Sequence, residues 1–96
     1  MLRHIVLFKF KEENKAQNVA VTKAMLDALP EKIAEIWHSE TYVDVGVKSD
    51  NYDLMLVSDF EDAAALERYI IHPDHKAVGA FMVPVRESRS CVDIEL

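Results

Sequence analysis

Two segments of this sequence have the pattern of β-strands with mostly apolar side chains on both faces. The alternating sets are His4, Val6, Phe8 and Phe10 against Ile5 and Leu7 in residues 2–11, and Leu54 and Leu56 against Met55 and Val57 in residues 52–60. A strand of this kind lies inside a sheet that has other structure packed on each face. Any fold that the chain adopts must therefore cover both sides of these strands.

Apolar residues at helical spacing occupy most of the segment between the two strands. Residues 12–36 predict one long helix or two helices with a break, and Pro30 should end or kink the first of them. Asn14 is placed to cap its start. The expected buried stripe is Ala16, Val19, Ala20, Met25, Leu26 and Leu29. Residues 38–48 then predict a second strand, and its alternating valines are Val43, Val45 and Val47.

A second main helix follows residues 52–60. Asp59 or Asp62 should cap its start and Pro73 should stop it. Its expected buried face is Ala63, Leu66, Tyr69 and Ile70. Residues 74–83 have the spacing of another short helical segment. Residues 85–96 predict a fourth strand, whose polar composition favours the edge of a sheet.

The order β-α-β-β-α-β predicts an α+β protein with the ferredoxin-like fold, formed by one domain over residues 1–96. In this fold the helices pack on one face of a four-stranded antiparallel sheet. The other face would be a large apolar patch on a monomer. We therefore expect a second copy to cover it, sheet face against sheet face, in a homodimer.

Charge and composition exclude several classes of function. The formal net charge of −6 argues against binding to nucleic acid or to an anionic membrane surface. No apolar run reaches the roughly 18 residues of a membrane-spanning helix. A single cysteine, Cys91, permits no internal disulfide, which suits a reducing compartment and predicts a cytoplasmic protein. With only two glycines there is no glycine-rich phosphate loop, and we expect no cofactor.

Several short motifs, in order along the chain, resemble the stress-responsive A/B barrel (Dabb) family. They are Arg3-His-Ile-Val-Leu-Phe-Lys-Phe-Lys11, Val45-Gly46, Tyr52-Asp-Leu54, Ser58-Asp-Phe-Glu61, Leu66-x-x-Tyr69, His72-Pro-Asp-His75 and Arg89-x-x-Val92-Asp93. The most specific of these is the His-Pro-x-His element. The resemblance covers essentially the whole chain and implies a dimeric α/β barrel. Many bacterial members of the family have no assigned activity, and one plant member, olivetolic acid cyclase, closes a polyketide by aldol condensation.

The resemblance to that cyclase implies three site residues. His75 matches its catalytic base, Tyr69 matches the tyrosine at the end of the second helix, and His4 matches a histidine early in the first strand. A neutral imidazole can remove a proton next to a carbonyl, and a tyrosine hydroxyl can orient that imidazole or stabilise an enolate oxygen. Two positions depart from the cyclase, with Leu54 where it has a histidine and Thr22 near its pocket tyrosine.

Each candidate also has a structural interpretation. His75 can hydrogen-bond to a backbone carbonyl and fix the bend after Pro73, Tyr69 can pack in the core with its hydroxyl on a polar partner, and His4 can be a satisfied core histidine. A metal site built on His72, Asp74 and His75 lacks a third good ligand, and we expect none.

Three functions therefore remain open, and the sequence does not decide whether the protein is an enzyme. The first is a protein that binds an apolar or aromatic small molecule between its sheet and helices. The second is a lyase or polyketide-cyclase-like enzyme, with His75 as general base and Tyr69 orienting it. The third is a structural or stress-response dimer in which His4, Tyr69 and His75 only stabilise the fold.

Overall fold

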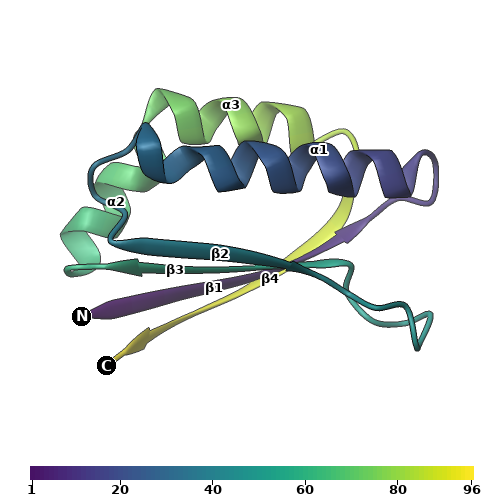
Figure 1. Cartoon of the computed structure of the whole chain (residues 1–96), viewed down its shortest axis with the longest axis horizontal. Helices are drawn as coiled ribbons and strands as arrows, with labels where there is room; N and C mark the ends of the chain where they lie inside the picture. Colours follow the sequence, from purple (N-terminus) through teal and green to yellow (C-terminus); the bar gives the residue numbers. More distant parts are fainter.

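All three helices lie on one face of a four-stranded sheet, and the opposite face is bare (Figure 1). This computed structural model describes residues 1–96. The elements in order are β1 (Leu2–Phe10), α1 (Lys15–Ala28), the 3-10 turn η1 (Leu29–Glu31), β2 (His38–Val43), β3 (Leu54–Phe60), α2 (Ala63–Ile71), α3 (Pro73–Met82) and β4 (Arg86–Glu95). The strands are antiparallel in the order β2-β3-β1-β4. The predicted ferredoxin-like α+β fold is confirmed, with β1 central and the polar β4 at an edge.

Alternation along β1 and β3 divides their side chains between two environments. Toward the helices, Val6, Phe10, Leu56 and Phe60 are almost fully buried. The core is completed by Ile33 of the loop after η1 and by residues of the helices, mainly Val19, Leu26, Leu66, Tyr69, Val78 and Met82. No helix of the chain combines the length and the apolar character that crossing a membrane requires.

The bare face carries a continuous apolar band across the sheet. The register pairs Ile5 with both Val57 and Val92, and it pairs Leu7 with Met55. Val92 is 54% exposed. We call this set, completed by Tyr42 of β2 and Ile94 of β4, the open face. It is the uncovered side that the two-sided strand pattern predicted.

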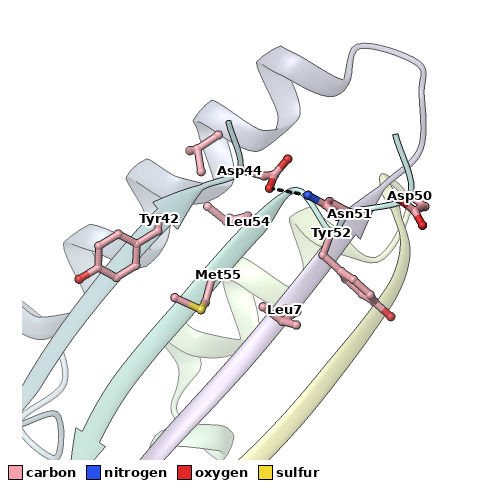
Figure 2. A pocket seen from close by; sticks show the side chains of 9 residues that line it. Leu7, Tyr42, Asp44, Asp50, Asn51, Tyr52, Leu54 and Met55 are labelled. Atoms are coloured by element: carbon pink, nitrogen blue, oxygen red, sulfur yellow. Dashed lines mark hydrogen bonds between the residues drawn. The ribbon is translucent and has the colours of Figure 1, made fainter. Parts of the chain in front are cut away.

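The second strand is shorter than predicted. β2 ends at Val43, and both Val45 and Val47 lie in the following loop with more than three quarters of their surface exposed. The Asp44 carboxylate accepts hydrogen bonds from the Gly46 backbone N–H and the Asn51 side-chain amide, the second of which is drawn in Figure 2. This turn around Asp44 has Gly46 at a positive φ of 81°. It ends β2 before Val45 and Val47, although the alternation of the valines predicted a continuing strand.

The buried face of α1 differs from the expected stripe. Ala16 and Ala20 are exposed, whereas Thr22 is fully buried. Asn14 precedes the helix in the left-handed conformation, and its side chain does not cap the first turn. As predicted, the helix ends before Pro30, which sits in the 3-10 turn.

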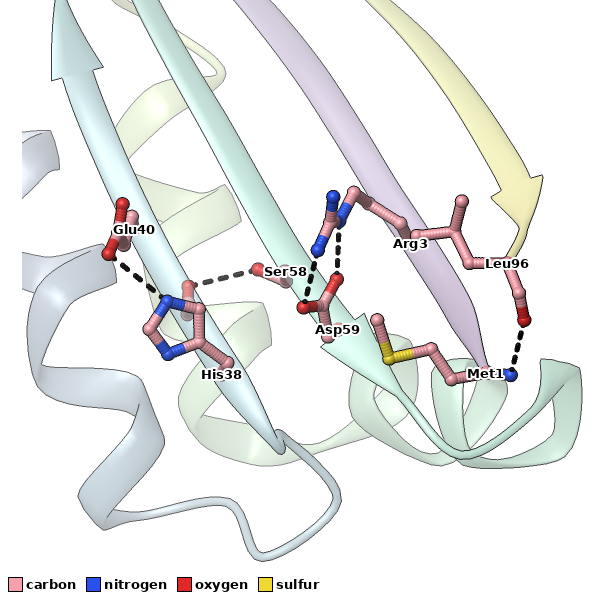
Figure 3. Close-up of polar contacts among 8 residues, drawn as sticks. Met1, Arg3, His38, Glu40, Ser58, Asp59 and Leu96 are labelled. Atoms are coloured by element: carbon pink, nitrogen blue, oxygen red, sulfur yellow. Dashed lines mark hydrogen bonds and ion pairs between the residues drawn. The ribbon is translucent and has the colours of Figure 1, made fainter.

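The start of α2 settles which aspartate caps it. The Asp62 carboxylate accepts a hydrogen bond from Ala65 N–H, so Asp62 is the cap. Asp59 instead lies on β3, where both of its oxygens accept hydrogen bonds from the Arg3 guanidinium at 2.7 and 3.0 Å (Figure 3). This cross-strand pair holds the pKa of Asp59 below its usual range.

The predicted inner face of α2 was partly wrong. Ala63 and Ile70 are exposed, and Ala65 is buried in their place beside Leu66 and Tyr69. Pro73 ends α2 as expected, but it is also the first residue of α3, where its missing N–H is not needed.

Candidate functional site

A cavity of about 210 Å³ lies between the helices and the sheet. Its apolar walls come from β1, β3 and the helices, chiefly Val6, Phe8, Leu26, Leu56, Val78 and Met82. Its polar lining comprises His4, Tyr69 and His75 together with Arg86 and Arg89 of β4. The three residues singled out in the sequence are therefore brought to one cavity, and the two arginines are additional.

Tyr69 lies between the two histidines. Its ring centroid is 4.5 Å from that of His75 and 6.3 Å from that of His4. The three side chains come from the last turn of α2, the first turn of α3 and the beginning of β1. They meet because α3 starts directly at Pro73 and carries His75 back against the end of α2.

The backbone determines which ring nitrogen of His75 carries the proton. Nδ1 of His75 lies 3.0 Å from the carbonyl oxygen of Ile70. A carbonyl can only accept, so Nδ1 is the donor and, in the neutral ring, Nε2 keeps its lone pair. Burial lowers the pKa of His75, the hydrogen bond to Ile70 partly offsets this, and the charges of His4 and Arg89 lower it further. His75 is therefore a neutral imidazole near pH 7.

Tyr69 is 1% exposed, yet its hydroxyl donates to no protein group, contrary to the expected polar partner. The one fully enclosed side-chain nitrogen or oxygen without a hydrogen bond is Oγ1 of Thr22. The Tyr69 hydroxyl is not enclosed in this way, and Tyr69 lines the cavity. Burial raises the pKa of Tyr69 to about 12, an effect that the charge of Arg89 opposes. Tyr69 is thus a protonated donor available to a molecule in the cavity.

His4 has a partner that the sequence did not reveal. Its Nδ1 lies 2.5 Å from Oδ1 of Asp93, the residue opposite it in the pairing of β1 with β4. The carboxylate accepts, which leaves Nε2 of the neutral ring without its proton. Only the register of β4 on β1 could have identified Asp93, because 89 residues separate the two positions.

Cys91 completes the nearest approach to a metal-ligand set. Nδ1 of His4, Sγ of Cys91 and a carboxylate oxygen of Asp93 all lie within 4.8 Å of one another. Two ligands on one zinc ion stand roughly 3 Å or more apart, so the 2.5 Å contact of His4 with Asp93 is that of a hydrogen bond instead. Burial and the Asp93 charge raise the pKa of the Cys91 thiol, which keeps it protonated.

Both histidines of the His-Pro-x-His element form hydrogen bonds with the backbone. Nδ1 of His72 accepts a hydrogen bond from the backbone N–H of Asp74, and Nδ1 of His75 donates to Ile70. His72 therefore caps the start of α3.

A wider hollow of about 460 Å³ lies on the opposite side of the sheet (Figure 2). Leu7, Tyr42 and Met55 of the open face form its floor, and Asn51 and Tyr52 of the β2–β3 loop form its rim. The hollow is continuous with the apolar band and contains no histidine. It is part of the surface available for assembly, whereas the candidate residues His4, Tyr69 and His75 line the cavity on the helix side.

Comparison with known proteins places this fold in a family. The family model of the stress responsive A/B barrel domain matches residues 2–96. A search of curated proteins finds no match.

Three solved structures share the fold over nearly the whole chain. A dimeric protein of unknown function with a ferredoxin-like fold from Bacteroides fragilis NCTC 9343 is 32% identical, over 99% of this chain and 95% of that one, with a TM-score of 0.91. A dimeric ferredoxin-like protein of unknown function from Thermobifida fusca is 30% identical, over 99% and 90%, with a TM-score of 0.87. Hydroxynitrile lyase from Passiflora edulis is 17% identical, over 99% and 92%, with a TM-score of 0.85, and shows the fold alone. The family match over residues 2–96 establishes that this chain belongs to the stress responsive A/B barrel domain family.

Proposed function

We propose that the protein binds a small apolar or aromatic molecule in the cavity between its sheet and helices. The observation that carries the proposal is an apolar-walled cavity into which three polar side chains, His4, Tyr69 and His75, are gathered. Ligand sites have this composition, an apolar lining with a few placed polar groups. The volume of about 210 Å³ suits a molecule with roughly one aromatic ring, since a cavity of about 150 Å³ can hold benzene.

The binding unit in this proposal is a homodimer of one domain spanning residues 1–96. Its support is the apolar band of the open face, which a second sheet would cover. The Bacteroides fragilis and Thermobifida fusca relatives are described as dimeric. A cytoplasmic location remains a prediction from the single cysteine.

A second function, proton transfer of the lyase or cyclase type, is favoured by the tautomer of His75. With Nδ1 donating to Ile70, Nε2 is free to remove a proton from a carbon next to a ligand carbonyl. The proton goes to Nε2, the electron pair of that C–H bond forms a C=C bond, and the π electrons of the carbonyl move to its oxygen, which gives an enolate. The protonated Tyr69 hydroxyl is suited to donate to that oxygen or to orient the imidazole.

Native mass spectrometry of gently purified protein tests the binding proposal. The expected result is a dimer that carries a small molecule at stoichiometric level, which denaturing analysis of the released compound then identifies. An empty dimer, which also binds no single-ring compound in an NMR titration, would favour the structural stress-response alternative.

Two substitutions of His75 separate its structural role from its chemistry. His75→Asn places an amide N–H where Nδ1 stands and can keep the hydrogen bond to Ile70, whereas His75→Ala loses it. We expect His75→Ala to destabilise the protein by about 1–3 kcal/mol and His75→Asn by much less. Both variants should lose proton transfer from the identified ligand, measured as deuterium exchange at the carbon next to its carbonyl. Exchange at the wild-type rate in His75→Asn would remove His75 as the base.

A further inference from the structure

The four arginines of this chain divide into two pairs with different surroundings. Arg3 is paired with Asp59, and Arg68 is paired with Glu35. Arg86 and Arg89 both line the cavity, and neither has a carboxylate within 4.0 Å. Acidic residues outnumber basic ones by 17 to 11, so carboxylate partners are not scarce in this chain. The two guanidinium groups at the cavity are left without an internal anion.

An irregularity of β4 places these two side chains on the same face of the sheet. In a regular strand, residues three apart point to opposite faces of the sheet. The pairing of β4 with β1 shifts between Lys9 and Phe10, so that Phe8 stands opposite Arg89 and Phe10 stands opposite Arg86. The extra residue turns both arginines to the face of Phe8 and Phe10, the face that bears the helices. Bulges re-aim side chains in this way and are frequent beside functional sites.

Position and charge make this pair suited to an anionic group. Arg86 is half-buried and Arg89 is exposed, which places them at the solvent side of the cavity. A guanidinium presents a planar fork of donors that matches a carboxylate in two parallel hydrogen bonds. The charge of Arg89 also acts on His75 and Tyr69, so an anion bound there would lie near both.

We propose that Arg86 and Arg89 bind the carboxylate of a small aromatic or alkyl carboxylic acid whose apolar body occupies the cavity. The inference rests on the proposed binding function and narrows its ligand class from apolar molecules to amphipathic acids. A phosphate ester fits less well, because the cavity adds no glycine-rich loop to its two arginines. The acid group lies at the mouth, and the reacting part of the molecule lies inward, beside Tyr69 and His75.

Titration of isotope-labelled protein with matched probes tests this assignment by NMR. Benzoate carries the carboxylate, benzamide is its neutral counterpart of the same shape, and phenyl phosphate carries the alternative anion. We expect benzoate to bind at least about tenfold more tightly than benzamide, as charge-assisted hydrogen bonds require. In Arg86→Gln/Arg89→Gln the two affinities should become equal, with that of benzamide unchanged. Arg86→Lys/Arg89→Lys should recover part of the preference, because it keeps the charge but loses the fork.

Arg68→Gln is the matched control, since it removes an arginine of α2 that does not line the cavity, and it should keep the full preference for benzoate. A wild-type protein that does not distinguish benzoate from benzamide would overturn the proposal. A double glutamine variant that still prefers benzoate would also overturn it, and so would a wild-type protein that prefers phenyl phosphate to benzoate. Loss of dimerisation in the double glutamine variant would have the same consequence. Binding of benzamide alone would remove the carboxylate subsite and leave the binding function, whereas binding of neither ring compound would remove both.

Discussion

The two faces of this sheet differ in what they bury and in what they leave exposed. The helix-covered face holds polar groups inside an apolar core, with His4, Tyr69 and His75 at one cavity. The open face carries half-buried apolar side chains such as Leu7 and Val57. The hollow at its loop end contains no histidine (Figure 2).

This difference indicates a division of labour between the faces. A buried polar group without a protein partner is costly, and so is an apolar band left in water. The first cost is removed by a ligand that supplies hydrogen bonds, and the second by another protein surface. We infer that the helix-covered face serves binding and the open face serves assembly, and the following variants test that separation.

The largest effect is expected from a charge in the middle of the open face. Leu7→Asp would place one unpaired carboxylate from each subunit in the dimer interface, and we expect the dissociation constant of the dimer to rise by roughly a thousandfold or more. Analytical ultracentrifugation over a concentration series measures this. The cavity lies on the other side of the sheet, so the fold of the monomer should persist in circular dichroism.

Ile71→Asp is the control for this variant. Ile71 is 65% exposed and lies on α2, away from the open face, so its substitution should leave the dimer intact. If Leu7→Asp dimerises as tightly as the wild type, the open face is not the interface. If the wild type itself is a monomer at micromolar concentration, assembly through this face is wrong altogether.

The contrast between faces was partly visible in the sequence. Two-sided strands such as residues 2–11 predicted both the central position of β1 and the need for a covered second face, because side-chain alternation depends only on local geometry. The length of β2 was not predictable in the same way. There the carboxylate of Asp44 closes a turn that competes with the alternation of the valines, and only the energies of the two arrangements decide between them.

A second prediction concerns Tyr69, the most buried of the cavity residues with a polar tip. Tyr69→Ala should destabilise the protein by about 3–5 kcal/mol, because it removes a large aromatic side chain from a buried position. Tyr69→Phe should change stability by less than about 0.5 kcal/mol, because the hydroxyl makes no hydrogen bond within the protein. Urea unfolding of the three proteins measures both differences.

Phe60→Leu provides a comparison in the same core, since Phe60 contacts Tyr69 with a ring separation of 5.0 Å but does not line the cavity. It should lower stability and spare ligand binding. Tyr69→Phe should show the reverse, with stability kept and affinity for a polar ligand reduced. A large loss of stability in Tyr69→Phe would mean that the hydroxyl has a structural partner, and the binding role would lose its support.

The candidate site could be predicted only as far as the family resemblance names its residues. His75 and Tyr69 stand six positions apart around one helix break, and they were identified together with His4 through the family resemblance. Asp93 and the two arginines were missed because their roles depend on strand pairing. A bulge that places Arg86 and Arg89 on one face cannot be deduced from β4 alone, since it is defined by the register against β1.

A third prediction uses Arg3 and Asp59, the ion pair beside the apolar band (Figure 3). The pKa of Asp59 is lowered by its hydrogen bond to Arg3, so its contribution to stability is present above the unfolded pKa of about 3.9 and is lost as the pH falls through the lower folded value. Arg3→Gln should therefore move the midpoint of acid unfolding to higher pH. Arg68→Gln, which breaks a pair on the helix side, should move it less, because Glu35 is more exposed than Asp59.

The smallest effect is expected from the protonation of His75, and it tests whether the helix-covered face is built around a neutral imidazole. Burial lowers the pKa of His75 in the folded state, so the unfolded chain binds more protons between that value and the unfolded pKa of about 6.5. Stability is then fully present above pH 6.5 and declines as the pH falls toward the folded value. The partial exposure of His75 keeps the decline shallow.

His75→Asn cannot take up this proton, so between about pH 7.5 and 5.5 its Tm should fall by roughly 1–2 °C less than that of the wild type. Equal pH dependence in the two proteins would mean that His75 titrates alike in both states. The cavity would then not favour the neutral form of His75. The inference that the helix-covered face serves binding would depend on Arg86 and Arg89 alone.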